Sequence, residues 1–137
     1  MIQLGVALAT PQLADRENYG RLARAMLETV AFVNGTFLEA HPETPALYRA
    51  GVLYGGTRED GFRIFDIPAI MLQGQGLCSH LSAWRVAELR RAGERAGFRI
   101  VWTPTDPSEF HVLVRRSNGD LEDPSEVLGM TPWPYSL

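Results

Sequence analysis

Four residues in the second half of the sequence have the side chains needed for nucleophilic chemistry on a carbonyl group. Cys78 is the only cysteine of the 137-residue chain, so an intrachain disulfide is excluded. It is therefore an inert core residue, a metal ligand or a reactive thiol. A reactive thiol needs a base that accepts its proton and an acid that orients the base. His111 is the candidate base, and Glu122 and Asp123 are the candidate acids.

The sequence around Cys78 predicts that its thiol lies at the first turn of a helix. A glycine-rich loop at residues 74–77 precedes it, and we expect a helix over about residues 79–96, ended by Gly97. Unpaired N–H groups and the positive end of the helix dipole favour the thiolate there. The same N–H groups could stabilise an oxyanion. Gln73 is a further candidate donor, although a solvated loop position is the ordinary role of such a glutamine.

Of the three histidines, His111 is preferred as the base because it lies inside a predicted strand, where a rigid backbone can aim its ring. His80 follows the cysteine by two helical positions, which point about 200° apart, so it should face away. His41 precedes a proline at a predicted helix end and is expected to be a capping or surface residue. No standard zinc-ligand spacing fits a site made of Cys78, His80, His111 and Asp123.

The tight turn predicted at residues 117–119 decides which acid shares a sheet face with His111. A two-residue loop would place Glu122 on that face. A three-residue loop would place Asp123 there, with a diagonal distance of ~7–8 Å between Cα atoms. The residues alone leave both acids open.

Hydrophobic patterning predicts the elements of the first half. Residues 2–9 are expected to form a strand or an extended edge. A helix is expected from about Glu17 to Ala40, ended by His41-Pro42, with an apolar face formed by Leu22, Met26, Val30, Val33 and Phe37. Residues 42–77 are expected to be an ordered connection with short helical turns, anchored by apolar side chains that include Tyr48, Phe62 and Ile67.

The second half predicts a sheet. Strands are expected over residues 98–102 and 110–115, and a third from Leu121 to Asp123, where Pro124 interrupts it. The expected class is α+β, with helices packed on an antiparallel sheet. Trp84 and Trp102 are expected in the core, and the tail Thr131-Pro132-Trp133-Pro134-Tyr135 could dock on the domain or on a partner.

The order of these motifs resembles the transglutaminase-like superfamily, and most of all its small phage and prophage proteins. The resembling stretches include Gly74-Gln75-Gly76-Leu77-Cys78, Phe110-His111-Val112-Leu113 and Glu122-Asp123-Pro124-Ser125, and together they cover well over half the chain. The resemblance implies a transglutaminase-like (papain-like) fold, in which a central helix carrying the cysteine packs on a small antiparallel sheet carrying the histidine and the aspartate. It implies a catalytic triad of Cys78, His111 and Asp123, which favours the three-residue loop.

The resemblance also implies an activity: acyl transfer or hydrolysis at a peptide or isopeptide bond, on a protein or peptide of a phage or its host. That reaction needs no metal or organic cofactor. Leu77, Ser79 and His80 stand where the family commonly carries acidic residues around the cysteine. The alternative is therefore a transglutaminase-like domain that has lost catalysis and serves as a binding or phage structural module. A papain-like protease would need a longer chain and a longer spacing from cysteine to histidine.

Composition restricts the class of partner. A hydrophobic content of 45% and a length of 137 residues suit one domain over residues 1–137 with one core. The net charge of −3 lacks the basic excess of a nucleic-acid-binding protein. Neither a signal peptide nor a membrane-spanning run is predicted, so we expect a cytoplasmic or virion-associated protein.

Overall fold

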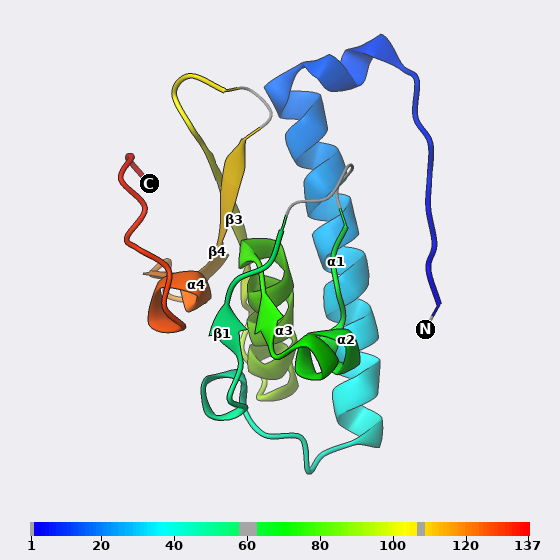
Figure 1. The fold of residues 1–137 in the computed structure, drawn as a ribbon, viewed down its shortest axis with the longest axis vertical. Coiled ribbons are helices and arrows are strands. Elements are labelled where there is room, and N and C mark those ends of the chain that lie inside the picture. The colour runs from blue at the N-terminus through cyan, green and yellow to red at the C-terminus, as the bar shows by residue number, and fades with distance from the viewer. Residues whose placement is uncertain (1, 58–62, 107–108) are drawn as a thin grey trace.

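The structure is a computed structural model, and it describes residues 2–57, 63–106 and 109–137. It is α+β (Figure 1). In chain order its elements are the 3-10 helix η1 (Pro11–Ala14), α1 (Arg16–Ala40), the 3-10 helix η2 (Leu47–Arg49), β1 (Leu53–Tyr54), α2 (Ile67–Gln73), β2 (Gln75–Gly76), α3 (Cys78–Arg91), β3 (Gly97–Trp102), β4 (Phe110–Arg115), β5 (Leu121–Glu122) and α4 (Pro124–Val127).

Helix α1 confirms the predicted first helix, but its most deeply buried row lies beside the predicted one, of which Val30 and Phe37 still pack on the core. Asp15 caps its start by accepting a hydrogen bond from the Glu17 N–H, and the helix ends one residue before His41. Its buried residues are Ala23, Leu27, Ala31, Asn34 and Leu38, one position along from the predicted row. Both rows contain apolar residues, so the sequence pattern did not decide between them. The buried row includes two alanines, whose small side chains suit the packing of α1 on α3.

Helix α3 lies at the centre of the molecule and contacts both α1 and β4. Apolar clusters surround it: one includes Val86 and the sheet residue Val112, and the other includes Trp84. The helix ends earlier than predicted, because Gly93 rather than Gly97 takes the left-handed conformation (φ 92°). The Glu94 N–H then bonds to the Leu89 carbonyl, which satisfies a free acceptor at the helix end. Burial of Trp84 confirms its predicted place in the core.

The three-stranded antiparallel sheet has the order β3-β4-β5 and settles the hairpin register. Val114 pairs with Glu122 and Arg115 with Leu121, which is the register of the three-residue loop at residues 117–119. Gly119 takes the left-handed position of that loop, with φ 91°. The third strand stops at Glu122, one residue earlier than predicted.

The two remaining segments are residues 2–9 and the connection over residues 42–77. Residues 2–9 were predicted to form a strand or an extended edge of the sheet, but they form no strand, and Figure 1 shows the segment standing apart from α1. Its alternating apolar side chains are exposed, since no neighbouring strand pairs with it. The connection over residues 42–77 contains the short helices η2 and α2, as predicted, and a parallel β1–β2 pair. Phe62, a predicted anchor, lies outside the described residues. Within the described part of the chain, no helix has the length and apolar character needed to cross a membrane.

Candidate active site

Cys78 is the first residue of α3, and 7% of its surface is exposed. The first hydrogen bond of the helix runs from the Leu81 N–H to the Leu77 carbonyl. The N–H groups of residues 78–80 therefore precede the helical ladder and point out of its N-terminus. Gly76 lets β2 approach this turn, because a Cβ there would lie 3.1 Å from Leu81 and 3.2 Å from the Cβ of His80. The sulfur thus lies beside a cluster of donors and the positive end of the helix.

His111 projects from β4, where it pairs with Val101 of β3, and is 2% exposed. Its Nε2 lies 2.8 Å from Oδ2 of Asp123. The side chain of Cys78 is also within hydrogen-bonding reach of the ring. Because Nε2 is engaged by Asp123, Nδ1 is the ring nitrogen left for the sulfur. The structure therefore brings the three residues of the predicted triad together in the order thiol, imidazole, carboxylate.

Asp123 is held by the start of the short helix α4. Its Oδ1 accepts hydrogen bonds from the N–H groups of Ser125 (3.1 Å) and Glu126 (3.3 Å), while Oδ2 faces His111. Pro124 occupies the first helical position, where its missing N–H costs nothing. The helix N-terminus therefore fixes the orientation of the carboxylate independently of its contact with His111. The Asp-Pro-Ser sequence supplies both the helix cap and the partner of the imidazole.

The surroundings of His111 favour its charged form. Burial acts to lower the pKa of His111, but the hydrogen bonds to Asp123 and Cys78 and their negative charges outweigh it and raise the pKa to about 9. At neutral pH the ring is an imidazolium, which donates from both nitrogens. It can therefore hold the carboxylate with one N–H and stabilise a thiolate with the other.

Glu122, the other candidate acid, is engaged elsewhere. It accepts hydrogen bonds from Tyr48 Oη (2.5 Å), Arg85 Nε (2.5 Å) and Arg116 Nη1 (2.9 Å). Burial acts to raise the pKa of Glu122, yet the hydrogen bonds from Arg85 and Tyr48 bring the pKa below its usual value. Glu122 therefore stays charged, as part of an ionic network that joins the sheet to α3. Nothing in the sequence pattern indicated these partners.

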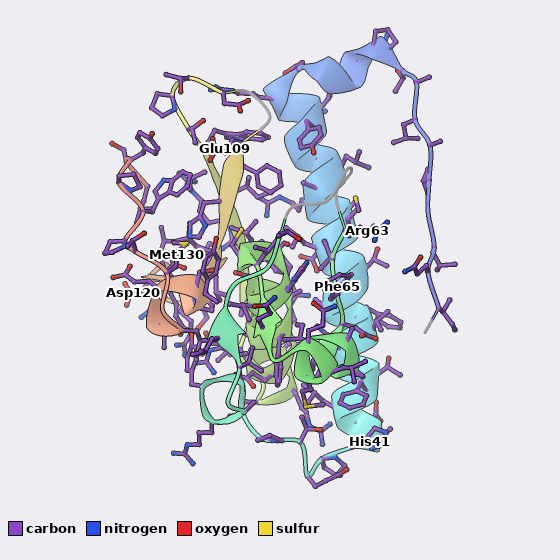
Figure 2. All side chains as sticks on the ribbon, viewed as in Figure 1. His41, Arg63, Phe65, Glu109, Asp120 and Met130 are labelled. Carbon is purple, nitrogen blue, oxygen red and sulfur yellow. The ribbon has the colours of Figure 1, made fainter. Side chains whose placement is uncertain are left out.

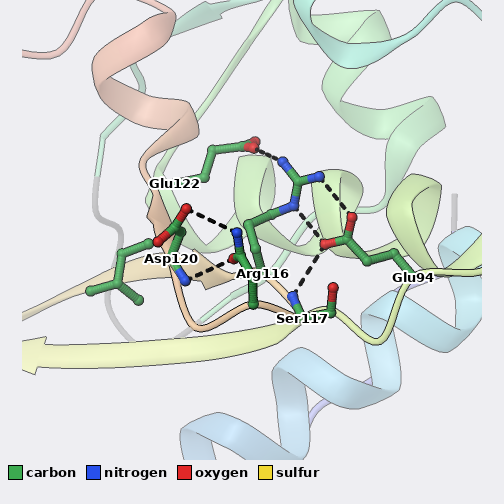
Figure 3. A pocket seen from close by; sticks show the side chains of 7 residues that line it. Glu94, Arg116, Ser117, Asp120 and Glu122 are labelled. Atoms are coloured by element: carbon green, nitrogen blue, oxygen red, sulfur yellow. Dashed lines mark hydrogen bonds and ion pairs between the residues drawn. The ribbon is translucent and has the colours of Figure 1, made fainter.

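Figure 3 shows the outer end of this network, where Arg116 bridges Glu122 and Glu94. These residues line a pocket together with the hairpin turn, and neither Cys78 nor His111 is part of its wall. Its charged side chains are paired with one another, and those pairs tie the turn after α3 to the β4–β5 hairpin. This pocket therefore belongs to the scaffold that fixes Asp123 rather than to the reacting groups.

His80 serves the helix end and not the thiol. Its Nδ1 accepts from the Leu77 N–H (3.1 Å), and its Nε2 lies 3.1 Å from the carbonyl oxygen of Arg63. Phe65 packs on the ring at 4.6 Å, and Figure 2 shows Arg63 and Phe65 on the segment that leads into α2. Burial lowers the pKa of His80, so the ring stays neutral and Nδ1 remains an acceptor.

The other candidate residues lie outside this arrangement. His41 is exposed at the end of α1, as predicted for a capping or surface residue, with Nδ1 3.3 Å from Glu43 Oε1. Gln73 is exposed at the last position of α2, and no described contact joins it to Cys78. Among the described residues, no group of three or more His, Cys, Asp or Glu side chains is arranged to hold a metal ion.

One residue at the site has no role in the sequence prediction of the triad. Trp133 of the C-terminal tail stacks on His111, with ring centroids 4.9 Å apart and an angle of 15° between the planes. The only signal was the Pro-Trp-Pro sequence, which indicated a docked tail without indicating where it docks.

Comparison of the chain with models of known protein families, with curated proteins and with solved structures found no significant match. The functional conclusion therefore rests on the site itself and on the sequence motifs that form it.

Proposed function

We propose that this protein is a transglutaminase-like cysteine enzyme that forms an acyl-enzyme at Cys78, with His111 as proton carrier and Asp123 as the group that orients it. The observation that carries the proposal is the continuous line from the Cys78 side chain through the His111 ring to Oδ2 of Asp123. A cysteine that only fills the core has no need of a charged histidine beside it. A histidine that only fills the core has no need of a carboxylate held by a helix cap. The three together match the requirements of an activated nucleophile.

The chemistry follows from this geometry. The sulfur attacks a carbonyl carbon, and the first-turn N–H groups of α3 stabilise the oxyanion that forms. The C–N bond of the amide breaks as His111 gives its proton to the leaving nitrogen, which leaves a thioester on Cys78. Water or a second amine then attacks the thioester while His111 accepts its proton, and the thiolate is released. Asp123 stabilises the imidazolium between these steps.

The expected substrate is a protein or peptide, cleaved or joined at a peptide or isopeptide bond. This expectation comes from the transglutaminase-like resemblance, as does the proposed setting in a phage or its host. The fold supports it to the extent that a central helix carries the cysteine and a small antiparallel sheet carries the histidine. The acceptor, water or an amine, decides between hydrolase and transferase.

Reaction of the full chain with p-nitrophenyl acetate tests the proposal, because an active thiol expels p-nitrophenolate and keeps the acetyl group. We expect a burst of p-nitrophenolate and a mass increase of one acetyl group on Cys78. The Cys78→Ala variant should lose both signals, and His111→Gln should slow the burst by about 10²-fold or more. Adding a primary amine should yield its acetyl amide if the enzyme is a transferase.

Equal acetylation of the wild-type protein and of a folded His111→Gln variant would contradict the proposal. It would favour the alternative of a transglutaminase-like module that binds without catalysing.

A further inference from the structure

The indole of Trp133 covers one face of the imidazole of His111, and it comes from the last seven residues of the chain. We propose that Trp133 is a positioning residue of the cysteine site, which holds the His111 ring against Asp123 and Cys78. This inference rests on the proposed function, since the group being positioned is its proton carrier.

The contact is specific because one short stretch of chain supplies two supports for the same ring. Asp123 holds the ring edge at Nε2, and α4 then reverses the chain and delivers Trp133 to the ring face. A hydrogen bond at one ring atom still allows the ring to tilt about that atom. A parallel contact over the face opposes the tilt. Edge and face together fix the plane of the ring, and Nδ1 is the nitrogen left for the Cys78 side chain.

The C-terminal tail, residues 131–137, is held in place by its two prolines and by hydrogen bonds near each of its ends. Pro132 and Pro134 each force the preceding residue into an extended conformation, so little freedom is left to lose on docking. The Met130 N–H bonds to the Ser125 carbonyl at 2.9 Å, and Arg99 Nη2 bonds to the Leu137 carbonyl at 3.0 Å. The position of the indole is therefore determined by the fold.

Aromatic contacts, and not a hydrogen bond of the indole, hold Trp133 in place. Its Nε1 atom is buried and has no hydrogen-bond partner among the described residues. The indole instead stacks on His111 and receives the edge of Tyr135, with ring centroids 5.3 Å apart. An imidazolium attracts the face of an indole, so the stack is stronger while His111 carries the charge that the reaction needs.

Two variants of the full chain separate positioning from simple packing. Trp133→Ala removes the aromatic face, and Trp133→Phe keeps a smaller one. Phe32→Ala is the matched control, because it removes an aromatic ring that is 76% exposed on α1. Circular dichroism establishes that each variant is folded, and two measurements follow: the NMR shift of the His111 ring protons and the rate of Cys78 alkylation by iodoacetamide.

In the wild-type protein we expect the ring current of Trp133 to shift the His111 ring protons upfield. Trp133→Ala should remove that shift and slow alkylation about three- to tenfold, the size expected for losing one aromatic contact. Trp133→Phe should restore most of the rate, and Phe32→Ala should match the wild type.

If folded Trp133→Ala is alkylated at the wild-type rate, the inference is overturned, whether or not the NMR shift changes. If Trp133→Ala does not fold, either of two results would overturn it: an alkylation rate in Trp133→Phe as low as that of His111→Gln, or no upfield shift of the His111 ring protons in the wild type.

The His111→Gln variant separates the failure of this inference from the failure of the proposed function. If His111→Gln alkylates as fast as the wild type, the proposed function fails and this inference with it. If His111→Gln is slow and Trp133→Ala is not, only this inference fails.

Discussion

Glu122 and Asp123 are adjacent carboxylates with different tasks, and one residue of hairpin register separates them. Glu122, on the last position of β5, turns toward Arg85, while Asp123 leaves the strand and turns toward His111. The residues alone do not choose between the two acids, because a turn that contains one glycine fits loops of either two or three residues. The family resemblance selected Asp123, and the observed register places its carboxylate beside the imidazole.

Exchanging each carboxylate for its amide tests this division. Asp123→Asn keeps a helix-capping side chain but removes the charge that stabilises the imidazolium, so acetylation of Cys78 should slow by about 100-fold or more. Glu122→Gln should keep the acetylation rate within about threefold, since it does not touch the ring. It should instead lower the free energy of unfolding by about 1–2 kcal/mol, because Arg85 and Arg116 lose a charged partner in a half-buried network.

Acetylation bursts and urea unfolding curves measure the two effects. Equal loss of the burst in both variants would show that the carboxylates do not have separate tasks.

At the scale of elements, the existence of α1, α3, β3 and β4 was predictable, whereas their ends and buried faces were less so. Periodicity locates a helix, but α1 has two neighbouring rows of mainly apolar residues, and the pattern does not say which row is the more deeply buried. Likewise Gly93 and Gly97 could each end α3, and it is Gly93 that takes the left-handed conformation. These choices depend on tertiary packing, which local pattern does not contain.

The N-terminal cap of α3 could also not be predicted, since its acceptor is the neutral ring of His80. His80→Leu should lower the free energy of unfolding by about 1–2 kcal/mol, because the Leu77 N–H loses its acceptor. His80→Gln can accept the same hydrogen bond in a capping box and should recover most of that loss. Urea unfolding at neutral pH measures both variants. Equal destabilisation by Leu and Gln would contradict the capping role.

At the scale of the whole molecule, two buried histidines with opposite pKa shifts should shape the pH dependence of stability. The pKa of His111 is raised from 6.5 to about 9, so its contribution is complete below pH 6.5 and is lost as the pH rises through about 9. That contribution is up to about 3 kcal/mol. The pKa of His80 is lowered, so its contribution is present above pH 6.5 and is lost as the pH falls below that value. Stability should therefore be greatest near pH 6.5.

Urea unfolding across the pH range measures this profile. His111→Gln should flatten the alkaline limb and leave the acidic limb unchanged, since His80 is intact. An alkaline limb that persists in His111→Gln would assign it to other groups.

Cys78, His111 and Asp123 are proposed to form one coupled unit, and an NMR titration of the His111 ring tests this coupling most directly. Its pKa should be about 9 in the wild-type protein, because both neighbours favour the imidazolium. It should fall in Cys78→Ala and fall in Asp123→Asn, since each variant removes one of the two interactions that raise it. A wild-type pKa near 6.5, or one that neither substitution changes, would contradict the coupled site.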